Sequence, residues 1–204
     1  MLSHVGHPGL VSDKVEARAY QLKAVDDALA GSTLLILPTA AGKTAVAWMS
    51  IVERMERAGG WALVIAPTVA LSNQHLENAI PVLSKSKEWN PIVLSGQQTA
   101  SKRPDLWSGS RLVFATPQVV RNDVEKGVLS LQDCCLLVVD EAHHCTGEHA
   151  MAEVADMYLS QSKDPLILAT TASPGSRREQ VHEICRRLGT VSYTHLRAHE
   201  TSID

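Results

Sequence analysis

Three successive residues, Gly42, Lys43 and Thr44, have the types and spacing needed to hold a chain of phosphates. They follow a short apolar run at residues 34–37 and precede a helical pattern, AVAWMSIVERM. A strand, a tight turn and a helix N-terminus direct backbone N–H groups and the positive end of the helix dipole toward an anion. In such a loop the lysine contacts the outer phosphates, and the threonine hydroxyl is a ligand of Mg²⁺.

This loop alone leaves two interpretations open. The full pattern G-x-x-x-x-G-K-[ST] is not met, because Leu37 occupies the position of its first glycine. An ordinary strand-to-helix turn therefore explains the loop as well as a nucleotide site does. A second motif is needed to decide between them.

The second motif is acidic and lies at the end of the most hydrophobic run, LLVVDEAH. Asp140 would hold Mg²⁺, directly or through water, because a hard cation beside phosphates prefers carboxylate oxygen. Glu141 would orient and deprotonate an attacking water, and phosphoryl transfer asks the protein mainly for positioning and charge neutralisation. A solvated turn after a buried strand is the alternative, and the upstream Gly42-Lys43-Thr44 argues against it.

Apolar runs and helical patterns alternate along the chain. We expect strands at residues 34–37, 61–67, 91–96, 111–117, 134–140 and 164–170, and helices at residues 15–29, 45–55, 68–83, 117–127, 149–162 and 176–189. This rhythm predicts an α/β fold, an open parallel sheet with helices on both faces. Ligand sites in such sheets lie at the carboxyl ends of strands, where both motifs fall.

Composition limits the function classes. The chain has 204 residues, 45% of them hydrophobic, and a formal net charge of −3, so nucleic-acid binding would need local patches and backbone contacts. No apolar run approaches ~20 residues, and we expect no membrane span. The N-terminus lacks an apolar signal core, and the four cysteines lack disulfide-framework spacing, which indicates a cytoplasmic protein with reduced thiols.

The two ends of the chain are predicted to lie outside the folded domain. Residues 1–14 have the character of a loose lead-in, and the domain is predicted to span residues 15–190. Residues 191–201, VSYTHLRAHET, have neither a strand nor a helix pattern. They match one reading frame of a widely used transposon-type sequencing adapter, so we predict that residues 191–204 are a non-native tail and that the natural protein continues.

PTAAGKT together with DEAH resembles the superfamily 2 helicases and translocases, and further motifs follow in the order of that family. RAYQ at residues 18–21 resembles its adenine-recognition element, and APTVALSNQH and FATPQVVRND resemble its two strand-gripping motifs. TASPG at residues 171–175 resembles the motif that couples hydrolysis to movement. Within the superfamily, the residues of these motifs are most similar to those of the archaeal Hef helicase/nuclease and the Fanconi anaemia group M translocase.

The resemblance implies a role for each matching position. Gln21 would hydrogen-bond the adenine edge and Arg18 would stack on its face, while Ala40 departs from the glycine usual in the family. The implied nucleotide-binding residues are Arg18, Gln21, Thr39, Ala40, Ala41, Gly42, Lys43 and Thr44. The implied ligands of Mg²⁺ are Thr44 and Asp140, and the implied catalytic residues are Lys43, Asp140 and Glu141. The implied nucleic-acid contacts are Thr68, Gly96, Thr116 and Gln118, and the implied coupling residues are His143, Thr171 and Ser173.

The resemblance also implies a function. The chain would be the N-terminal RecA-like P-loop NTPase domain of an ATP-dependent DNA helicase or translocase, using ATP and Mg²⁺ on single-stranded or branched DNA in repair. It would act in the cytoplasm in association with the nucleoid, together with a second RecA-like domain in cis that is missing after Gly189. An RNA helicase and an ATP-gated nucleic-acid clamp remain alternatives.

Three other groups of residues could bind a metal or a nucleic acid, but each also has a purely structural interpretation. The cluster formed by His143, His144, Cys145 and His149 suggests zinc, but no C-x-x-C pair completes a site. Trp48 and Trp61 are predicted to pack, while Trp89 and Trp107 stay open between packing and base stacking. A loose basic group is expected to be a solvated face, and it comprises Lys85, Lys87, Lys102 and Arg103.

Overall fold

A computed structural model describes residues 3–4, 6–38, 41–173, 178–190 and 192–195 of the chain. Its centre is a seven-stranded sheet in the order β5-β6-β4-β7-β8-β3-β9, and every neighbouring pair is parallel. The strands are β3 (Thr33–Ile36), β4 (Trp61–Ile65), β5 (Ile92–Leu94), β6 (Leu112–Ala115), β7 (Cys134–Asp140), β8 (Ile167–Thr171) and β9 (Ser192–His195). The predicted α/β class and parallel sheet are confirmed.

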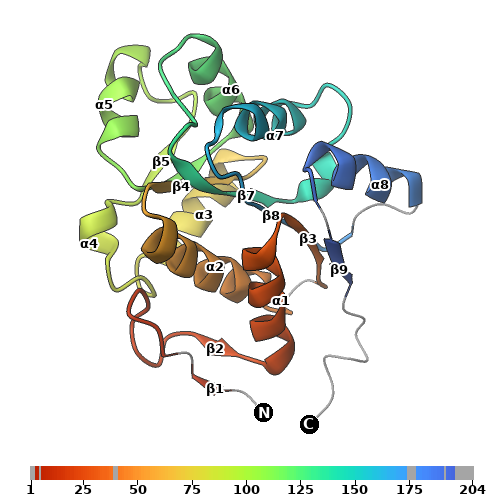
Figure 1. The fold of residues 1–204 in the computed structure, drawn as a ribbon. Coiled ribbons are helices and arrows are strands. Elements are labelled where there is room, and N and C mark those ends of the chain that lie inside the picture. Colours follow the sequence, from red (N-terminus) through yellow and green to blue (C-terminus); the bar gives the residue numbers. More distant parts are fainter. Residues whose placement is uncertain (1–2, 5, 39–40, 174–177, 191, 196–204) are drawn as a thin grey trace.

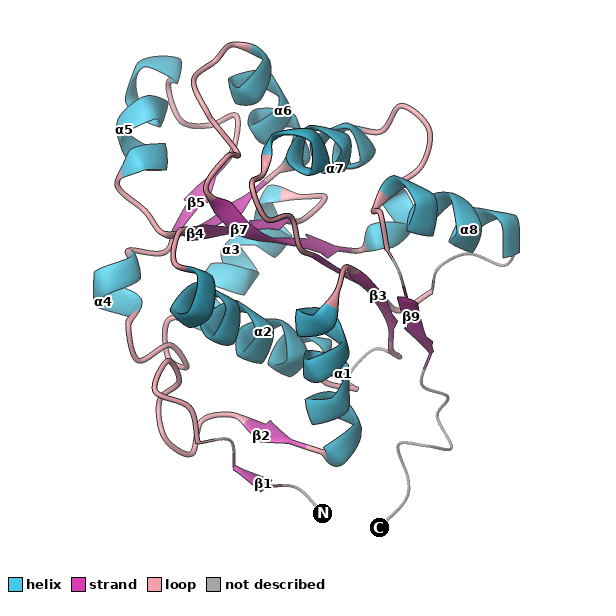
Figure 2. Ribbon diagram, in the orientation of Figure 1, coloured by secondary structure: helices cyan, strands magenta, loops and turns pink. Residues whose placement is uncertain are grey.

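Helices cover both faces of this sheet (Figures 1 and 2). One face carries α1 (Ala19–Ala30), α2 (Lys43–Ala58), α3 (Val69–Ala79) and α4 (Ser86–Trp89). The other carries α5 (Arg103–Ser108), α6 (Pro117–Glu125), α7 (Ala150–Gln161) and α8 (Arg178–Arg187). Two short 3₁₀ turns complete the described helices, η1 (Ala100–Lys102) and η2 (Ala142–His144). None of the helices in the described ranges has the length and apolar character needed to cross a membrane.

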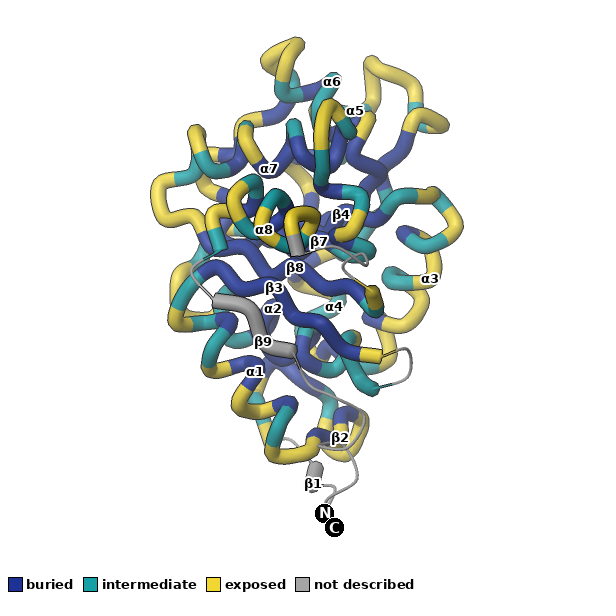
Figure 3. The backbone as a smooth tube through the Cα atoms, turned by 90° about the vertical axis from the view of Figure 1, so that its right-hand side faces the viewer, coloured by how far each residue is buried: buried dark blue, intermediate teal, exposed yellow. Residues whose placement is uncertain are grey.

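Each central strand supplies side chains to two separate hydrophobic clusters. On β3, Leu35 packs into the cluster under α1 and α2, whereas Leu34 packs into the cluster under α7 and α8. Successive side chains of a strand point to opposite faces, so a strand with a layer of helices on each side must be apolar at every position. Figure 3 shows the central strands as buried and the exposed segments on helices and loops. This explains the continuous apolar runs in the sequence.

Most element boundaries agree with the sequence patterns, and two differ for identifiable reasons. α1 begins at Ala19 rather than at residue 15, because Glu16 and Ala17 form β2 (Glu16–Ala17), antiparallel to β1 (Ser3–His4). α3 ends at Ala79 instead of reaching residue 83. Pro81 restricts the residue before it and cannot donate a helical hydrogen bond, which favours an end at this point.

The expectation of a loose lead-in over residues 1–14 is wrong for most of the segment. Leu10 is buried and forms an isolated antiparallel bridge with Leu83. The ring of His7 approaches the carboxylate of Glu53 on α2, with 2.7 Å between Nε2 and Oε2. Residues 7–11 are thus attached to α2 and to the segment after α3, so they belong to the folded domain.

The expectation that the C-terminal tail lacks regular structure is wrong for residues 192–195. They form β9, which pairs in parallel with β3 from Thr33 opposite Ser192 to Ile36 opposite His195. Without β9, β3 would be an edge strand, and the unpaired N–H and C=O groups of an edge accept almost any extended segment. The non-native origin of residues 191–204 stays a prediction, and Val191 and residues 196–204 lie outside the described residues.

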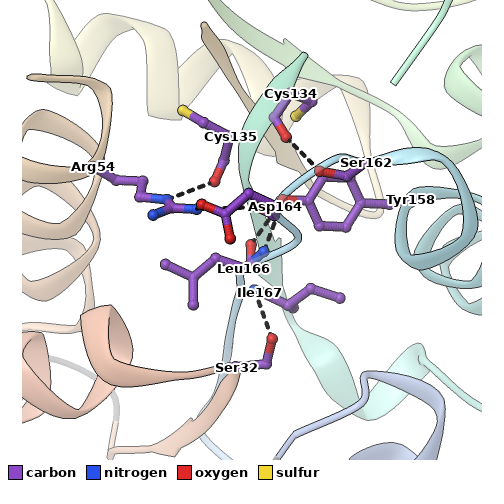
Figure 4. A network of polar contacts seen from close by, with 9 residues as sticks. All are labelled: Ser32, Arg54, Cys134, Cys135, Tyr158, Ser162, Asp164, Leu166 and Ile167. Carbon is purple, nitrogen blue, oxygen red and sulfur yellow. Dashed lines mark hydrogen bonds and ion pairs between the residues drawn. The ribbon is translucent and has the colours of Figure 1, made fainter. Parts of the chain in front are cut away.

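The loop that leads into β8 is fixed by polar contacts from several elements (Figure 4). The guanidinium of Arg54 on α2 donates to the Cys135 carbonyl at 2.9 Å and to the Asp164 carboxylate at 2.6 Å. The Tyr158 hydroxyl on α7 accepts from the N–H of Leu166 at 3.0 Å and donates to its carbonyl at 3.2 Å. Two further bonds join Ser162 to the Cys134 carbonyl and the Ile167 N–H to Ser32. These contacts hold β8 between its neighbours.

Arg103 does not belong to a solvated basic face, which corrects the sequence interpretation. Its Nε lies 2.8 Å from the carboxylate of Asp123 on α6, and the Asp123 side chain is fully buried. Trp107 also donates to this carboxylate at 2.8 Å. A buried carboxylate is stable only when it is paired, and here the pairing attaches α5 to α6. Lys85 forms an ion pair with Glu56 at 2.7 Å.

The tryptophans contribute to packing. Trp48, Trp89 and Trp107 are buried, and Trp61 packs against Trp107 with 6.2 Å between ring centroids. The structure therefore resolves the open question on Trp89 and Trp107 in favour of the core. Buried indole rings are not available as platforms for bases.

We expect Arg103→Ala to lower the free energy of unfolding by about 3–5 kcal/mol, because it leaves the Asp123 carboxylate buried without its cation. Urea denaturation measures this loss. The matched control is Lys102→Ala at the exposed neighbouring position, which should change stability by less than ~0.5 kcal/mol. If the two variants have the same stability, the carboxylate does not depend on Arg103.

Candidate nucleotide-binding site

The turn from β3 into α2 has the backbone geometry of an anion cradle. Gly42 is the N-cap of α2 and adopts a left-handed conformation with φ 86°. Among the described residues, the first backbone bonds at this end of α2 are donated by Ala45 and Val46 to the Gly42 carbonyl, and the N–H groups of Lys43 and Thr44 have no partner within the helix. Two residues implied in nucleotide binding, Thr39 and Ala40, lie outside the described residues.

The N-terminus of α1 braces this turn. The Tyr20 hydroxyl donates to the Ala41 carbonyl at 2.9 Å, and Gln21 Nε2 donates to the carbonyls of Ala41 at 3.2 Å and Gly42 at 3.4 Å. Gln21 Oε1 accepts from the Arg18 backbone N–H at 2.7 Å. Both ends of the Gln21 amide are therefore bonded to protein, while Oε1 keeps a second lone pair, and the implied contact with adenine stays a prediction. The structure places Gln21 as a support of the phosphate loop.

Asp140 lies at the carboxyl end of β7 and uses both of its carboxylate oxygens. Oδ1 accepts from the Thr170 hydroxyl at 2.8 Å, and Oδ2 accepts from His75 Nε2 at 2.8 Å. Burial favours the neutral acid, but the hydrogen bond and charge of His75, with the hydrogen bonds from Thr170 and from the Glu141 backbone, outweigh it and lower the pKa of Asp140 below its ordinary value. The carboxylate form is thus stabilised, as a ligand of a divalent cation requires.

Glu141 has an unusual backbone. It is one of three non-glycine residues with positive φ among the described residues, with φ 53° and ψ 48°. This conformation costs a residue with a side chain about 1–2 kcal/mol. It turns the chain sharply from β7 into η2, which places the Glu141 carboxylate at the edge of the sheet, with Oε2 3.2 Å from His143 Nδ1.

The implied coupling residues are brought together at the end of β8. His143 Nδ1 lies 3.1 Å from the Thr171 hydroxyl, and this hydroxyl donates to the Ser173 carbonyl at 3.1 Å. The acidic motif is thereby joined to the start of the TASPG segment. Residues 174–177 of that segment and its surroundings lie outside the described residues.

The two chemical motifs share one cavity of about 370 Å³. Lys43 and Thr44 line it from α2, Asp140 and Glu141 from the end of β7, and Thr170 from β8. Further lining residues come from α2, α3 and the sheet, and they include Trp48, Leu71, Gln74, His75 and Asn78. A threonine hydroxyl beside a carboxylate offers the oxygen donors that Mg²⁺ prefers, with phosphates and water completing its shell. The donor set therefore fits Mg²⁺ with a nucleotide.

The histidine cluster is not arranged as a zinc site. The part of the chain that the structure describes contains no group of three or more His, Cys, Asp or Glu side chains positioned for a metal ion. Burial raises the pKa of the Cys145 thiol to about 12, which disfavours the thiolate that zinc binds. The rings of His144 and His149 stack with 5.5 Å between centroids.

The implied nucleic-acid contacts follow three adjacent strands. Thr68, after β4, is the exposed N-cap of α3, and Gly96 follows β5 in an exposed loop. Thr116 and Gln118 follow β6, where Gln118 is exposed and Thr116 is 7% exposed. Because the order is β5-β6-β4-β7-β8-β3, these residues occupy one half of the carboxyl edge and the nucleotide motifs occupy the other.

Three residues of the site have contacts that the sequence analysis did not assign. Tyr20 and His75 lie within motifs that resembled the family, but no role was given to them. Thr170 ends the predicted strand at residues 164–170. Their partners are 21, 65 and 30 residues away along the chain, so local spacing carried no signal for these contacts.

An open parallel sheet with a phosphate loop and an acidic strand end at its carboxyl edge defines a P-loop NTPase domain. The sequence model of the DEAD/DEAH box helicases matches residues 18–181. The chain belongs to this family.

The relatives refine this assignment. A Methanocaldococcus jannaschii protein with the provisional name ATP-dependent RNA helicase MJ1505 is 38% identical over 91% of this chain and 23% of its own length. ATP-dependent DNA helicase MPH1 of Pyricularia oryzae is 37% identical over 92% of this chain and 17% of its own. The Fanconi anemia group M protein of Gallus gallus is 35% identical over 84% of this chain and 8% of its own.

A solved structure agrees with these sequences. The Hef helicase domain of Pyrococcus furiosus superposes with a TM-score of 0.85 and 34% identity, covering 91% of this chain and 40% of that one. The resemblance to superfamily 2 helicases of the Hef and Fanconi group M type is thus confirmed. The chain spans about a quarter or less of the length of these curated relatives.

We expect Gly42→Ala to destabilise the phosphate loop in two ways. A Cβ at this position would lie 1.8 Å from Gln21 Nε2, and the left-handed backbone adds about 1–2 kcal/mol. Gly127→Ala is the matched control, since Gly127 also has positive φ but has no atom within 4 Å of an added Cβ. Thermal unfolding should show the larger loss for Gly42→Ala. In the Gln21→Ala background the excess should shrink, and an unchanged excess would rule out the clash with Gln21.

Proposed function

We propose that this domain binds and hydrolyses ATP with Mg²⁺ and uses that energy to move the protein along DNA. The observation that carries the proposal is the cavity in which Lys43 and Thr44 face Asp140 and Glu141. It is supported by membership of the DEAD/DEAH box helicase family.

The residues of the cavity divide the chemistry among them. The ammonium of Lys43 and the N–H groups at the start of α2 bind the phosphates, while Thr44 and Asp140 hold Mg²⁺. When bound, the metal ion neutralises charge on the phosphates. Glu141 accepts a proton from the attacking water and orients it for in-line attack. His143 lies against Glu141 and Thr171, which supports a role in transmitting a change at the water site to the TASPG segment.

DNA is proposed to lie along the other half of the carboxyl edge. Backbone amides and short side chains at Thr68, Gly96, Thr116 and Gln118 would contact phosphate and sugar, which carry no sequence information. The chain has a net charge of −3, so few cations are available for phosphates. We therefore expect binding with a shallow dependence on salt, because each neutralised phosphate adds to that dependence.

A second RecA-like domain in cis is proposed to complete the nucleotide site and the DNA track. Relatives several times longer than this chain support it. Movement requires two bodies that close on ATP and reopen after hydrolysis. A residue supplied across the cleft, such as an arginine finger, raises phosphoryl-transfer rates by roughly 10³–10⁵.

We propose that the protein acts in the cytoplasm, associated with the nucleoid.

DNA is favoured over RNA by the names of several relatives. MPH1 and Fancm are named as DNA helicases, and their similarity extends over 90–92% of this chain. We propose that this DNA is single-stranded, forked or branched and that the protein acts in repair, as the resemblance of the motifs to the Hef and Fanconi group M type implies. RNA is the second candidate, since MJ1505 is 38% identical and carries the name of an RNA helicase.

In the full-length protein, where a second RecA-like domain is proposed to complete the site, Lys43→Ala and Glu141→Gln should separate nucleotide binding from turnover. We expect Lys43→Ala to weaken ATP affinity by about 10- to 100-fold, the value of a charge-assisted hydrogen bond. Glu141→Gln should leave affinity nearly unchanged and slow hydrolysis by about 10²–10⁴-fold, since only proton transfer is removed. Fluorescent ATP titration and single-turnover hydrolysis measure the two quantities. An equal loss of binding in both variants would contradict these roles.

The choice between DNA and RNA is tested by measuring how far each nucleic acid stimulates the ATPase rate of the full-length protein. We expect forked and single-stranded DNA to raise the ATPase rate well above the rate with duplex RNA, and Glu141→Gln to abolish the stimulation. Greater stimulation by duplex RNA would favour the second candidate. A strand-displacement assay separates a motor from an ATP-gated clamp, because a clamp binds DNA in the presence of ATP without unwinding it.

A further inference from the structure

The Asp140 carboxylate is held in one orientation by two hydrogen bonds from opposite sides. Thr170 donates to Oδ1 and His75 approaches Oδ2, each at 2.8 Å. A carboxylate has no hydrogen to donate, so the proton of this second bond is on His75 Nε2. Each oxygen retains a lone pair for a metal ion or its water. Rotation of the carboxylate would break both bonds at once.

The ring of His75 is itself fixed by aromatic packing. It stacks on Phe114 of β6 with 6.3 Å between centroids and an angle of 13° between the planes. It also meets Trp48 of α2 edge-on at 6.5 Å. Both partners are buried, at 0% and 4% exposure. The donor that meets Asp140 therefore comes from a ring with little freedom to turn.

His75 lines the same cavity as Lys43 and Thr44, but it lies on α3 and bonds to Oδ2 of Asp140. A group that donates to a metal ligand fixes the direction of the lone pairs that the metal will use. Changing such partners typically costs 10- to 100-fold in metal affinity. Nothing else in the proposed chemistry requires a histidine at this place.

We propose that His75 is a positioning residue, which orients the Asp140 carboxylate toward the divalent cation through its Nε2–H. The inference rests on the proposed function, because it assumes that Asp140 binds the cation of a metal–nucleotide complex. In this proposal His75 acts through Asp140 rather than by binding the nucleotide.

Two substitutions separate the hydrogen bond from the packing. His75→Phe keeps an aromatic ring between Phe114 and Trp48 but removes the donor. His75→Gln keeps an N–H donor at a similar reach but removes the ring. The probe is Mn²⁺ with ADP, where electron paramagnetic resonance reports free Mn²⁺ and a fluorescent ADP reports nucleotide binding with metal or with EDTA.

We expect His75→Phe to weaken the Mn²⁺ affinity of the ADP complex by about 10- to 100-fold and His75→Gln to recover most of it. ADP affinity in EDTA should be the same in both variants and in the original protein. Thr170→Val removes the second hydrogen-bond donor to Asp140, a hydroxyl, at nearly constant volume, and it should also weaken Mn²⁺ binding. Asn73→Ala, at an exposed position of α3, is the control that should change nothing.

Unchanged Mn²⁺ affinity in His75→Phe overturns the proposal. Equal losses in His75→Phe and His75→Gln also overturn it, because they assign the effect to ring packing. If a thermal scan shows that His75→Phe does not fold, His75→Gln and Thr170→Val decide the question. Normal Mn²⁺ binding by Thr170→Val would then show that metal binding does not require a fixed orientation of the Asp140 carboxylate. If the unsubstituted protein binds neither ADP nor Mn²⁺–ADP, the proposed function fails, and that result is visible before any variant is measured.

Discussion

Parallel pairing of β3, β8 and β7 is the constraint on which the whole site depends. Parallel strands end at the same edge of a sheet, so the phosphate loop after β3 and the acidic residues after β7 are brought to one place. β8 lies between them and contributes from both of its last residues. Thr170 bonds to Asp140, and Thr171 lies against His143. The contacts just before the other end of β8, from Arg54 to Asp164 and from Tyr158 to Leu166, fix the position of this central strand.

The edge is divided by strand order into a nucleotide half and a proposed nucleic-acid half, and α3 spans the division. Its N-cap, Thr68, follows β4, and the helix carries His75 against Asp140 at the end of β7. A helix is a stiff element, so its two ends move together. Rigid elements also explain how the strained backbone of Glu141 persists, because β7 and η2 determine it from both sides. The site is thus held by regular structure more than by loops.

The sequence predicted those features that depend on neighbouring residues. The motifs Gly42-Lys43-Thr44 and Asp140-Glu141 could be recognised in the sequence because a phosphate loop and a strand end are local patterns. The contacts of Tyr20 and His75 were not, since each joins residues brought together only by the fold. The same limit explains the error at Arg103, whose charge indicated solvent although its partner is a buried carboxylate. The pairing of β9 was missed because backbone hydrogen bonds at a strand edge do not depend on the side-chain pattern.

The sheet order also has a consequence for synthesis on the ribosome. Leu35 of β3 pairs with Thr170 of β8, a partner made 135 residues later. At ~5–20 residues per second, β3 waits about 7 to 27 s for this neighbour. During that time an apolar strand and the loop after it have no parallel partner on the β8 side, and contacts of such long range form slowly. Within this domain the phosphate loop is therefore translated well before its final surroundings are complete, so nascent chains of the domain are exposed to misassociation along β3.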